Sequence, residues 1–294
     1  MLNFTWLSDE DEATLQALAA RDWTRDALTL GVVDDEQLAA RAVALGAVAF
    51  HGFGNFYAIS THPDSLVVRY VNLLKARPLD QVGSVTTTRE HLADLFDWSQ
   101  VPAPLSQRTV TELMDTLLER GPFGFRGPAA ASMPAHLTAM DGSTRTTQVI
   151  SGGYGCPANA FLARCLEEVG QRYLYTTSAN RSRHATGNAD EPPHFTLRGL
   201  QEDFGAAAGV LILAHADERQ ARRAYPRYAP NSTTILAFHR IGGTRSRPAL
   251  RIERHGSLHV DDVRPIVAEL GFDLELGPNA QQRLPVRSYE VQAA

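Results

Sequence analysis

The clearest hydrophobic pattern in the chain lies in residues 64–78, with the sequence DSLVVRYVNLLKARP. Apolar side chains recur there at the spacing of an α-helix, namely at Leu66, Val67, Tyr70, Val71 and Leu74. An aspartate and a serine at its start can cap the first turn, and Pro78 ends it. The pattern therefore predicts an amphipathic helix that packs on a core and carries Lys75 and Arg77 in its last turn.

Helices and strands are predicted along the rest of the chain as well. Helical periodicity between capping residues and stop signals predicts helices over residues 35–45, 157–169 and 260–270, and a mainly helical stretch over 89–120. Short apolar runs predict strands over residues 47–50, 81–88, 146–150, 173–177, 209–214, 235–239 and 250–254. Residues 121–155 are rich in glycine, proline and small polar residues, so we expect mostly long connections there. The tail from residue 276 onward is expected to be peripheral.

The first 30 residues form an acidic leader. Ser8 and Asp11 fit a capping box, and a modest apolar face follows at Ala13, Leu15, Leu18 and Ala19. Such a face more often packs on the edge of its own domain than on a partner. We therefore expect a helix on the domain edge, with a partner-binding helix as the alternative.

Composition narrows the class of protein. The chain has 294 residues, 44% of them hydrophobic and 21% charged, which is typical of a globular protein with a substantial core. A net charge of -5 gives no overall basic surface for nucleic acid, although it is compatible with a local basic cleft. Cys156 and Cys165 have no C-x-x-C pattern or histidine cluster around them, so neither a disulfide framework nor a zinc site is predicted. With no signal-peptide pattern and no membrane-length apolar run, we expect a cytoplasmic protein without a membrane partner.

Polar and cationic residues gather where the predicted elements end. Lys75 and Arg77 suit an oligophosphate, although cations are also common in last helical turns because they complement the helix dipole. Residues 51–57 follow a buried strand with two glycines and Asn55, which let the backbone approach a ligand closely. Residues 178–182 put hydroxyl and amide groups after another strand, where they either meet an anion or form a simple turn.

A run of arginines forms a separate feature, at Arg219, Arg222, Arg223 and Arg227. Such a run is usually a solvated helix face. Phosphate binding is the less common alternative, because the guanidinium group suits phosphate geometry.

Four of these segments, in order, resemble the threonylcarbamoyl-AMP synthases, also called YrdC-like proteins. That family typically has a helix ending in K-x-R-P, a strand ending in T-S-A-N-x-S-G, a strand opening with S-T, and a late R-x-G. The matching residues here are 75–78, 177–182, 232–233 and 254–256. Each motif lies at a predicted element end, and the resemblance covers about residues 30–270.

The chain departs from the family pattern mainly in the substrate-facing loop. The family's P-T-D-T-x-Y-G-L loop corresponds to residues 52–57, where only Tyr57 is retained. Arg183 replaces the glycine of T-S-A-N-x-S-G, and of a proline and serine expected after K-x-R-P only Ser84 remains. The phosphate-facing motifs are better kept, which leaves open whether the amino acid bound is threonine.

The resemblance implies an α/β fold, specifically a YrdC-like twisted open sheet with flanking helices and a large electropositive cleft. It implies an N-terminal helical extension over residues 1–30, a YrdC-like domain over 31–275 and a C-terminal tail over 276–294. In the family's reaction, the amino group of threonine takes up bicarbonate to give a carbamate, whose oxygen attacks the α-phosphate of ATP and expels pyrophosphate. The implied ligands are ATP with Mg²⁺, bicarbonate and an amino acid, either threonine or an analogue. No cluster of acidic metal ligands is evident in the sequence.

The resemblance also assigns roles to the matching residues. Four are expected to take part in the chemistry: Lys75, Arg77, Ser178 and Asn180. The two cations would face the phosphates and carbamate, and the other two would hydrogen-bond the adenylate and carbamate. Ser232 would contact the nucleotide phosphate, and Arg254 would contact an anion. The remaining candidates for substrate or nucleotide binding are Asn55, Tyr57, Ser84, Thr177, Ser182 and Thr233.

Three functions are compatible with the sequence, beside an inactive α/β domain in which the motifs are kept for packing. The first is synthesis of threonylcarbamoyl-AMP for tRNA A37 modification, with tRNA or a downstream carbamoyl-transferring enzyme as partner. The second is a divergent relative that uses another amine or carbamoyl donor in specialised metabolism. The third is a non-catalytic RNA-binding protein that reuses the cleft. If Lys75 and Arg77 are exposed, Lys75→Ala and Arg77→Ala should cost little stability yet abolish ATP-dependent chemistry.

Overall fold

The computed structural model describes residues 8–182 and 191–289. Its strands are β1 (Leu28–Thr29), β2 (Val48–Phe53), β3 (Phe56–Thr61), β4 (Ser84–Thr86), β5 (Phe123–Pro128), β6 (Ala139–Asp141), β7 (Thr144–Ser151), β8 (Leu174–Ser178), β9 (Val210–Ala214), β10 (Ile235–Thr244), β11 (Arg247–Arg254) and β12 (Asp273–Leu276). Its α-helices are α1 (Asp9–Ala19), α2 (Val33–Ala44), α3 (Ser65–Leu74), α4 (Arg89–Leu92), α5 (Gln107–Arg120), α6 (Ala158–Val169), α7 (Leu197–Phe204), α8 (Glu218–Ala224) and α9 (Val260–Glu269). None of these helices is long and apolar enough to cross a bilayer.

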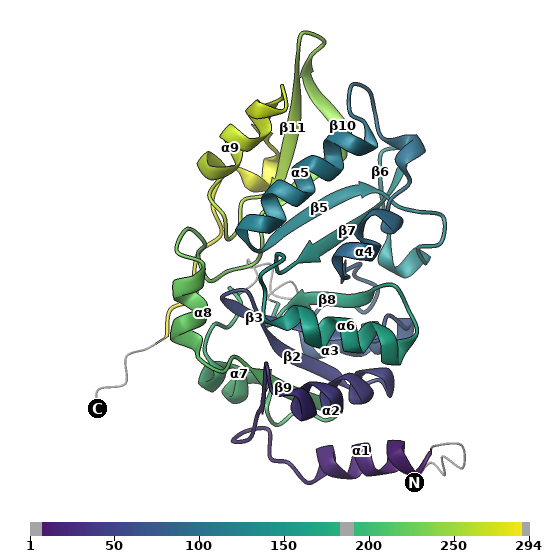
Figure 1. The fold of residues 1–294 in the computed structure, drawn as a ribbon, viewed down its shortest axis with the longest axis vertical. Helices are drawn as coiled ribbons and strands as arrows, with labels where there is room; N and C mark the ends of the chain where they lie inside the picture. Colours follow the sequence, from purple (N-terminus) through teal and green to yellow (C-terminus); the bar gives the residue numbers. More distant parts are fainter. Residues whose placement is uncertain (1–7, 183–190, 290–294) are drawn as a thin grey trace.

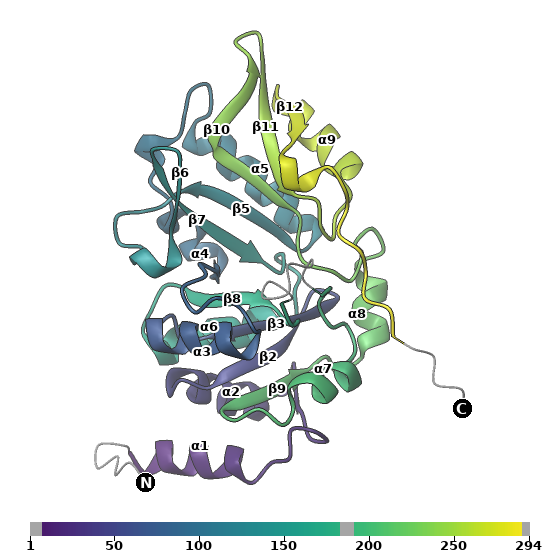
Figure 2. The same ribbon diagram turned by 180° about the vertical axis from the view of Figure 1, so that it is seen from behind.

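The strands of the described residues form one mixed sheet. Its order is β1-β9-β2-β3-β8-β4-β7-β5-β10-β11-β12, with β6 paired to β7. In Figure 1 the lower half carries α2, α3, α6 and α7, and the upper half carries α5 and α9. Figure 2 shows the same twisted sheet from behind. The expected α/β class, a twisted sheet with flanking helices, is confirmed.

The centre of the sheet brings together strands that are far apart in sequence. β8 pairs antiparallel with both β3 and β4, β4 pairs parallel with β7, and β7 pairs antiparallel with β5. β5 in turn lies parallel to β10. Polar side chains on one face of β4, β5, β7 and β8 therefore share one surface, although these strands span residues 84 to 178.

Helix α3 begins as predicted but buries only part of the predicted stripe. The Asp64 side chain accepts a hydrogen bond from the backbone N–H of Leu66, which caps the first turn. The Leu66 side chain itself is 74% exposed, so its expected place in the core is wrong. The fully buried positions are Val68, Val71 and Asn72, of which Val71 belongs to the predicted stripe. Tyr70 and Leu74 of that stripe are partly buried against the core. The asparagine amide donates to two backbone carbonyls just after the helix, those of Leu79 and Gln81, and this orients the face.

The glycine-rich segment after β2 is a β-hairpin rather than a loop. Residues 49–53 of β2 pair antiparallel with residues 56–60 of β3. Gly54 and Asn55 form the two-residue turn between them. Gly54 has φ +61°, the conformation that a tight hairpin turn requires. The Asn55 amide donates to the Tyr228 carbonyl oxygen at 2.8 Å. The predicted loop over residues 51–57 is therefore corrected to two buried strands joined by a short turn.

Residues 121–155 contain central strands that their composition conceals. β5 and β6 were expected to be connections, whereas β7 confirms the strand predicted over residues 146–150. A Cβ at Gly124 would lie 2.6 Å from the Ile150 side chain, and one at Gly127 would lie 2.1 Å from the Phe238 ring. These glycines thus make room for neighbouring side chains within a strand, a use that turn statistics do not anticipate.

The helix caps are predicted with mixed success. α1 has the expected capping box between Ser8 and Asp11. α2 begins at Val33, two residues before the predicted start, and has no side-chain cap. Asp35 instead accepts a hydrogen bond from the backbone N–H of Thr29 at 2.8 Å, because its carboxylate faces the preceding strand.

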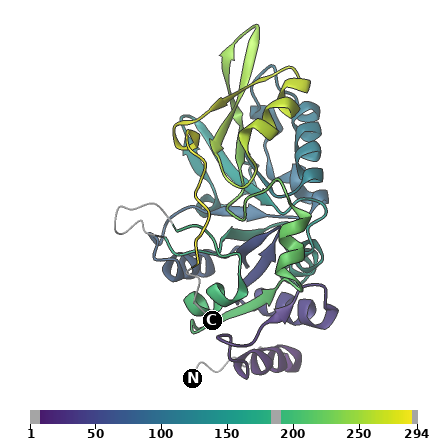
Figure 3. The same cartoon turned by 90° about the vertical axis from the view of Figure 1, so that its left-hand side faces the viewer.

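The C-terminal segment lies along the domain and is not peripheral. The backbone N–H of Leu284 donates to the His255 carbonyl oxygen at 2.8 Å. Arg287 pairs with Glu191 at 2.8 Å and donates to the Pro192 carbonyl oxygen. Figure 3 shows this segment in yellow, running from the upper half of the molecule to the lower half. The tail therefore connects the end of β11 to the segment that precedes α7.

Buried histidines should make the fold sensitive to mild acid. Burial lowers the pKa of His51, His194 and His215 to about 4. Unfolded histidine takes up a proton near pH 6.5, so stability is present above that pH and falls as the pH approaches 4. Each histidine contributes at most about 3 kcal/mol to this loss.

We therefore expect the urea concentration at the midpoint of unfolding to be lower at about pH 5 than at about pH 7.5. His51→Gln should reduce the slope, because it removes one of the groups that titrate only in the unfolded chain. An equal midpoint at both pH values would contradict the burial of these rings.

Candidate functional site

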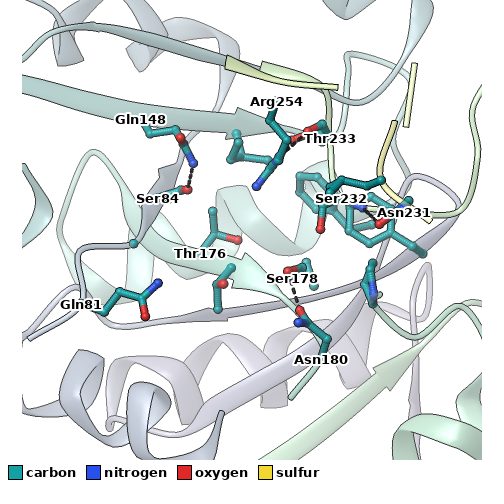
Figure 4. Close-up of a pocket in the computed structure, with 18 of the residues that line it drawn as sticks. Gln81, Ser84, Gln148, Thr176, Ser178, Asn180, Asn231, Ser232, Thr233 and Arg254 are labelled. Carbon is teal, nitrogen blue, oxygen red and sulfur yellow. Dashed lines mark hydrogen bonds between the residues drawn. The ribbon is translucent and has the colours of Figure 1, made fainter. Parts of the chain in front are cut away.

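A cavity of about 440 Å³ lies over the centre of the sheet. Its size suits a small-molecule ligand. The floor comes from the central strands β8, β4, β7 and β5, and the rim comes from loops and the end of β11 (Figure 4). The charged side chains in its described lining are Arg77, Arg126, Arg254 and Glu191.

Most of the predicted site residues meet in this cavity. The lining includes Arg77, Ser84, Thr177, Ser178, Asn180, Ser232, Thr233 and Arg254. They come from segments more than 100 residues apart, and the order of strands in the sheet brings them together. Each of the four motifs found in the sequence therefore contributes residues to one cavity.

Lys75 lies behind the cavity wall and has no exposed surface. Its ammonium donates to the backbone carbonyls of Ser178 and Asn180 and, at 3.0 Å, to the Asn180 side-chain Oδ1. The same Oδ1 accepts from the Ser178 hydroxyl at 2.6 Å. Lys75 thus fixes the segment after β8, and the expectation of an exposed cation at a helix end is wrong for this residue.

The chain reverses sharply after Lys75. Ala76 has φ +54°, and the backbone N–H of Ser182 donates to the Lys75 carbonyl oxygen at 2.7 Å. This reversal directs Arg77 into the cavity, where its Nη1 donates to the Thr177 hydroxyl at 3.1 Å. The K-x-R spacing therefore separates one buried cation from one that lines the cavity.

Arg254 is the cation with the clearest electrostatic signature. Its Nε donates to the Thr233 carbonyl oxygen at 2.7 Å and its Nη2 to the Thr233 hydroxyl at 2.9 Å. Burial lowers the pKa of Arg254 to about 10, and the nearby positive charge of Arg77 adds to this effect. Within the described residues Arg254 forms no ion pair with a carboxylate. An anionic ligand would relieve this unfavourable burial of charge.

The backbone at the end of β11 approaches residues 232–233 closely. A Cβ at Gly256 would lie 2.1 Å from the Ser232 carbonyl oxygen, so a side chain does not fit there. Gly256 donates its N–H to the Thr234 hydroxyl at 3.1 Å, and the Ser257 N–H donates to the Ser232 carbonyl oxygen. This packing explains why the R-x-G and S-T motifs occur together.

Three predicted binding residues do not line the cavity. The Asn55 amide donates away from it, to the Tyr228 carbonyl oxygen. Tyr57 is buried and its hydroxyl donates to Glu218 at 2.9 Å. Ser182 is buried beside Lys75. Because a hairpin replaces the expected loop, Asn55 and Tyr57 are turned into the packing around the site, whereas Ser182 is held against the end of α3 by its backbone hydrogen bond to Lys75.

The arginine run also lies away from the cavity lining. Arg222 donates to the Phe195 carbonyl oxygen and lies over the Phe195 ring. Arg227 pairs with Asp262 at 3.3 Å. Arg219 and Arg223 are exposed. The run fits the solvated helix face that its composition favours.

Several lining residues were not predicted from the sequence. They include Gln81, Arg126, Gln148, Thr176 and Asn231. Gln148 lies in the strand predicted over residues 146–150, and the sequence did not indicate which face of that strand would line a cavity. The Gln148 amide donates to the Ser84 hydroxyl at 2.5 Å, as Figure 4 shows. Nothing in the sequence marked Arg126 as a site residue, because no strand was predicted around it.

Three side chains on β6, β10 and β11 have the composition of a metal site, but they are surrounded by positive charge. Ligand atoms of Asp141, His239 and Glu253 lie within 4.8 Å of one another. Arg240 pairs with both carboxylates, and Arg126 pairs with Glu253 at 3.1 Å. These two guanidinium groups take the place that a cation would need, so the cluster fits an ion-pair network.

Comparison with known proteins gives the fold. No family model and no curated protein matches the sequence. The structure of a Sua5 variant from P. abyssi matches with a TM-score of 0.58 at 17% identity, over 83% of this chain and 62% of that one. A hypothetical protein from Streptococcus mutans matches with a TM-score of 0.57 at 16% identity, over 82% of this chain and 94% of that one.

A further structure, P. abyssi Sua5 complexed with L-threonine, matches with a TM-score of 0.55 at 16% identity, over 82% of this chain and 59% of that one. The chain thus spans about three fifths of the length of Sua5. At these identities the similarity concerns the fold. The protein has the α/β fold of the Sua5 and YrdC-like proteins.

Proposed function

We propose that the cavity binds ATP and that the protein is an ATP-dependent carbamoyl-adenylate synthase, with threonine as the default amine. Arg254 carries this proposal. It is a cation of lowered pKa beside Arg77, with no carboxylate partner in the described part of the chain. The hydroxyl and amide groups around it donate to anions without adding negative charge. Such a site suits phosphate oxygens better than a neutral ligand.

The proposed reaction has two steps. The amine and bicarbonate first form a carbamate and release water. A carbamate oxygen then forms a bond to the α-phosphorus of ATP, while the bond from that phosphorus to the β-phosphate bridging oxygen breaks and pyrophosphate leaves. The site must hold several anions together and stabilise the charge on the α-phosphate during transfer. Arginines and neutral donors suit both tasks.

The residues divide into binding and positioning groups. Arg77 and Arg254 bind phosphate and carbamate oxygens, and Ser232 with Thr233 donates to the nucleotide. Ser178 and Asn180 hydrogen-bond the adenylate and carbamate. Lys75 acts through these two residues, since it holds their backbone carbonyls and the Asn180 amide in place.

Mg²⁺ would enter this site bound to the nucleotide. The one carboxylate in the described lining, Glu191, is paired with Arg287. A cavity without a cluster of acidic ligands fits a Mg²⁺ ion that is held mainly by substrate phosphates and water. When bound, the ion would neutralise charge on the leaving pyrophosphate.

The product would be a mixed anhydride that reacts readily with water. A downstream carbamoyl-transferring enzyme would consume it, and tRNA A37 is the acceptor that the resemblance suggests. A Sua5 structure is described as complexed with L-threonine, which supports an amino acid as the amine here as well.

A second candidate is an enzyme that uses a different amine. Phe53 and Phe56 line the cavity beside the hairpin turn, in the segment that corresponds to the family's P-T-D-T-x-Y loop. Aromatic groups at that position would favour another substrate side chain. RNA binding without catalysis has less support, because the arginine run lies away from the cavity lining.

Pyrophosphate release tests the proposed activity. We expect release from ATP and Mg²⁺ to require both bicarbonate and an amine, since each supplies part of the nucleophile. A panel of amino acids and other amines identifies the substrate. Release that is independent of the amine and bicarbonate, or no release with any amine, would contradict the proposal.

A further inference from the structure

We propose that a groove between the ends of α5, α8 and α9 binds a small monocarboxylic acid that carries an apolar group. The inference is independent of the proposed function, because the groove and the cavity over the sheet have no described lining residue in common. Three features support it: an apolar wall, a charge balance that suits one anion, and a buried hydroxyl group without a partner.

The groove lies where the ends of three helices meet. It has a volume of about 480 Å³, which is within the range of small-molecule sites. Arg120 bounds it at the end of α5, residues 224–228 bound it from the end of α8 onward, and Leu258 and Asp262 bound it at the start of α9. Figure 1 shows α8 and α9 on the same side of the molecule, next to the end of α5 that leads into β5. The groove is therefore a second candidate site, apart from the cavity.

Much of the groove wall is apolar. Its apolar members are Ala224, Tyr225, Pro226 and Leu258. The ring of Tyr225 lies edge to face with that of Tyr228, and the ring centroids are 5.9 Å apart. Both rings pack on the backbone at the end of α5, because a Cβ at Gly121 would lie 2.9 Å from the Tyr225 ring and 3.0 Å from Cζ of Tyr228. A wall of packed rings suits the apolar part of a ligand.

The charged groups of the groove leave one positive charge without compensation. Arg227 pairs with Asp262 at 3.3 Å. Arg120 is exposed and, within residues 8–182 and 191–289, forms neither a hydrogen bond nor an ion pair. Two guanidinium groups and one carboxylate thus give the lining a net charge of +1, which one carboxylate of a ligand would balance. A cation in the last turn of a helix also complements the helix dipole, so Tyr228 is the more specific feature.

The Tyr228 hydroxyl is a neutral donor among these charges. Tyr228 is 7% exposed and lines the groove, and its hydroxyl makes no hydrogen bond to the described part of the chain. Burial raises the pKa of this hydroxyl to about 12, and the charges of Arg120, Asp262 and Arg227 all act on it. The group therefore stays protonated at neutral pH. A buried donor without an acceptor is unfavourable, and a carboxylate oxygen in the groove would satisfy it.

The position of Tyr228 is fixed by its main chain. Its carbonyl oxygen accepts a hydrogen bond from the Asn55 amide at 2.8 Å, and the residue forms an isolated β-bridge with Leu258. The next residue, Ala229, donates its N–H to the Ser257 carbonyl oxygen at 2.9 Å. These contacts hold the ring in place without using the hydroxyl. A variant that lacks only the hydroxyl therefore keeps the surrounding fold.

Calorimetry with small acids tests the groove. The probes are phenylacetate and hexanoate, with acetate as an acid that lacks the apolar group and phenylacetamide as the neutral match. We expect dissociation constants of about 1 mM or below for the two larger acids, and at least roughly tenfold weaker binding of acetate and phenylacetamide. Saturating ATP and Mg²⁺ should leave these values unchanged, because the two sites have separate linings.

Three variants locate the binding. Tyr228→Phe should weaken phenylacetate binding roughly tenfold, because it removes a hydrogen bond to a charged group. Its unliganded melting temperature should be equal to that of the wild-type protein or higher, since no hydrogen bond within the described chain is lost. Arg120→Gln should weaken binding by a similar factor. Arg219→Gln is the matched control and should bind normally, because Arg219 is an exposed arginine of α8 that does not line the groove.

Several results would overturn the proposal. Neither larger acid binds, the amide binds as well as the acid, or ATP displaces the acid. Wild-type affinity in Tyr228→Phe or Arg120→Gln, or an equal loss in Arg219→Gln, would place the acid elsewhere. A marked fall in the unliganded melting temperature of Tyr228→Phe would show that the hydroxyl already has a partner in the folded protein. Binding of a peptide that ends in phenylalanine, but of neither free acid, would assign the groove to a protein partner instead.

Discussion

Replacing Arg254 with glutamine should weaken ATP binding roughly 10- to 100-fold without destabilising the unliganded protein. The binding loss follows from removing a charged donor that faces the cavity beside Arg77. The small effect on stability follows from the lowered pKa of Arg254, about 10, which means that the folded protein bears a cost for its charge. Removing that charge offsets the loss of the two hydrogen bonds to Thr233.

Calorimetry with ATP and Mg²⁺, together with thermal unfolding, measures both effects. Arg251→Gln is a suitable control on the same strand, because Arg251 pairs with Glu275 and does not line the cavity. That variant should bind ATP like the wild-type protein. Wild-type affinity in Arg254→Gln, or a large drop in its unliganded melting temperature, would show that Arg254 serves packing rather than an anion.

Replacing Lys75 with methionine should impair both folding and catalysis. The side chain is fully buried, and its ammonium serves three acceptors in the segment after β8. Methionine fills similar space but donates no hydrogen bond, so we expect a loss of about 3 kcal/mol in the free energy of unfolding. Activity should fall further than stability explains, because Ser178 and Asn180 lose the group that orients them.

Arg77→Ala should reduce activity with a smaller loss of stability, since Arg77 lies partly exposed in the cavity.

Chemical labelling tests the burial of Lys75 independently. Lys75 is the only lysine in the chain, and the other side chains that carry a permanent positive charge are arginines. A compact ammonium with three donors fits the enclosed space behind β8, whereas the broad guanidinium of arginine suits the cavity itself. An amine-reactive reagent should leave Lys75 unmodified in the folded protein and modify it in denaturant, as peptide mass spectrometry would show. Rapid modification in the folded state would contradict its burial.

The sequence predicted those parts of the fold in which hydrophobic period and stop signals agree. Strand β9 and helix α6 are examples, since a continuous apolar run and a stripe ended by Gly170 gave the right elements. Strand β5 was missed because glycine, arginine and proline interrupt its pattern. Those residues are there for tertiary reasons: Gly124 and Gly127 accommodate side chains from other strands, and Arg126 faces a ligand cavity.

The candidate site was predictable where short motifs lie at element ends. Arg77, Ser178 and Arg254 meet in one cavity because the strands that carry them converge at the centre of the sheet. Sequence spacing could not show that Lys75 is buried while Arg77 lines the cavity, since the chain reverses between them at Ala76, which has a left-handed conformation. Nor could it show that Leu284 and Pro285 of the tail line the same cavity, because that contact is long-range.

The identity of the product tests the central claim most directly. The protein is incubated with ATP, Mg²⁺, ¹³C-labelled bicarbonate and the amine that supports pyrophosphate release, and the adenylates are analysed by mass spectrometry. We expect a carbamoyl-adenylate that contains the amine and carries the label, formed by the wild-type protein and not by Arg254→Gln. Only unlabelled AMP, or an adenylate that joins the amine to AMP without the labelled carbon, would contradict it.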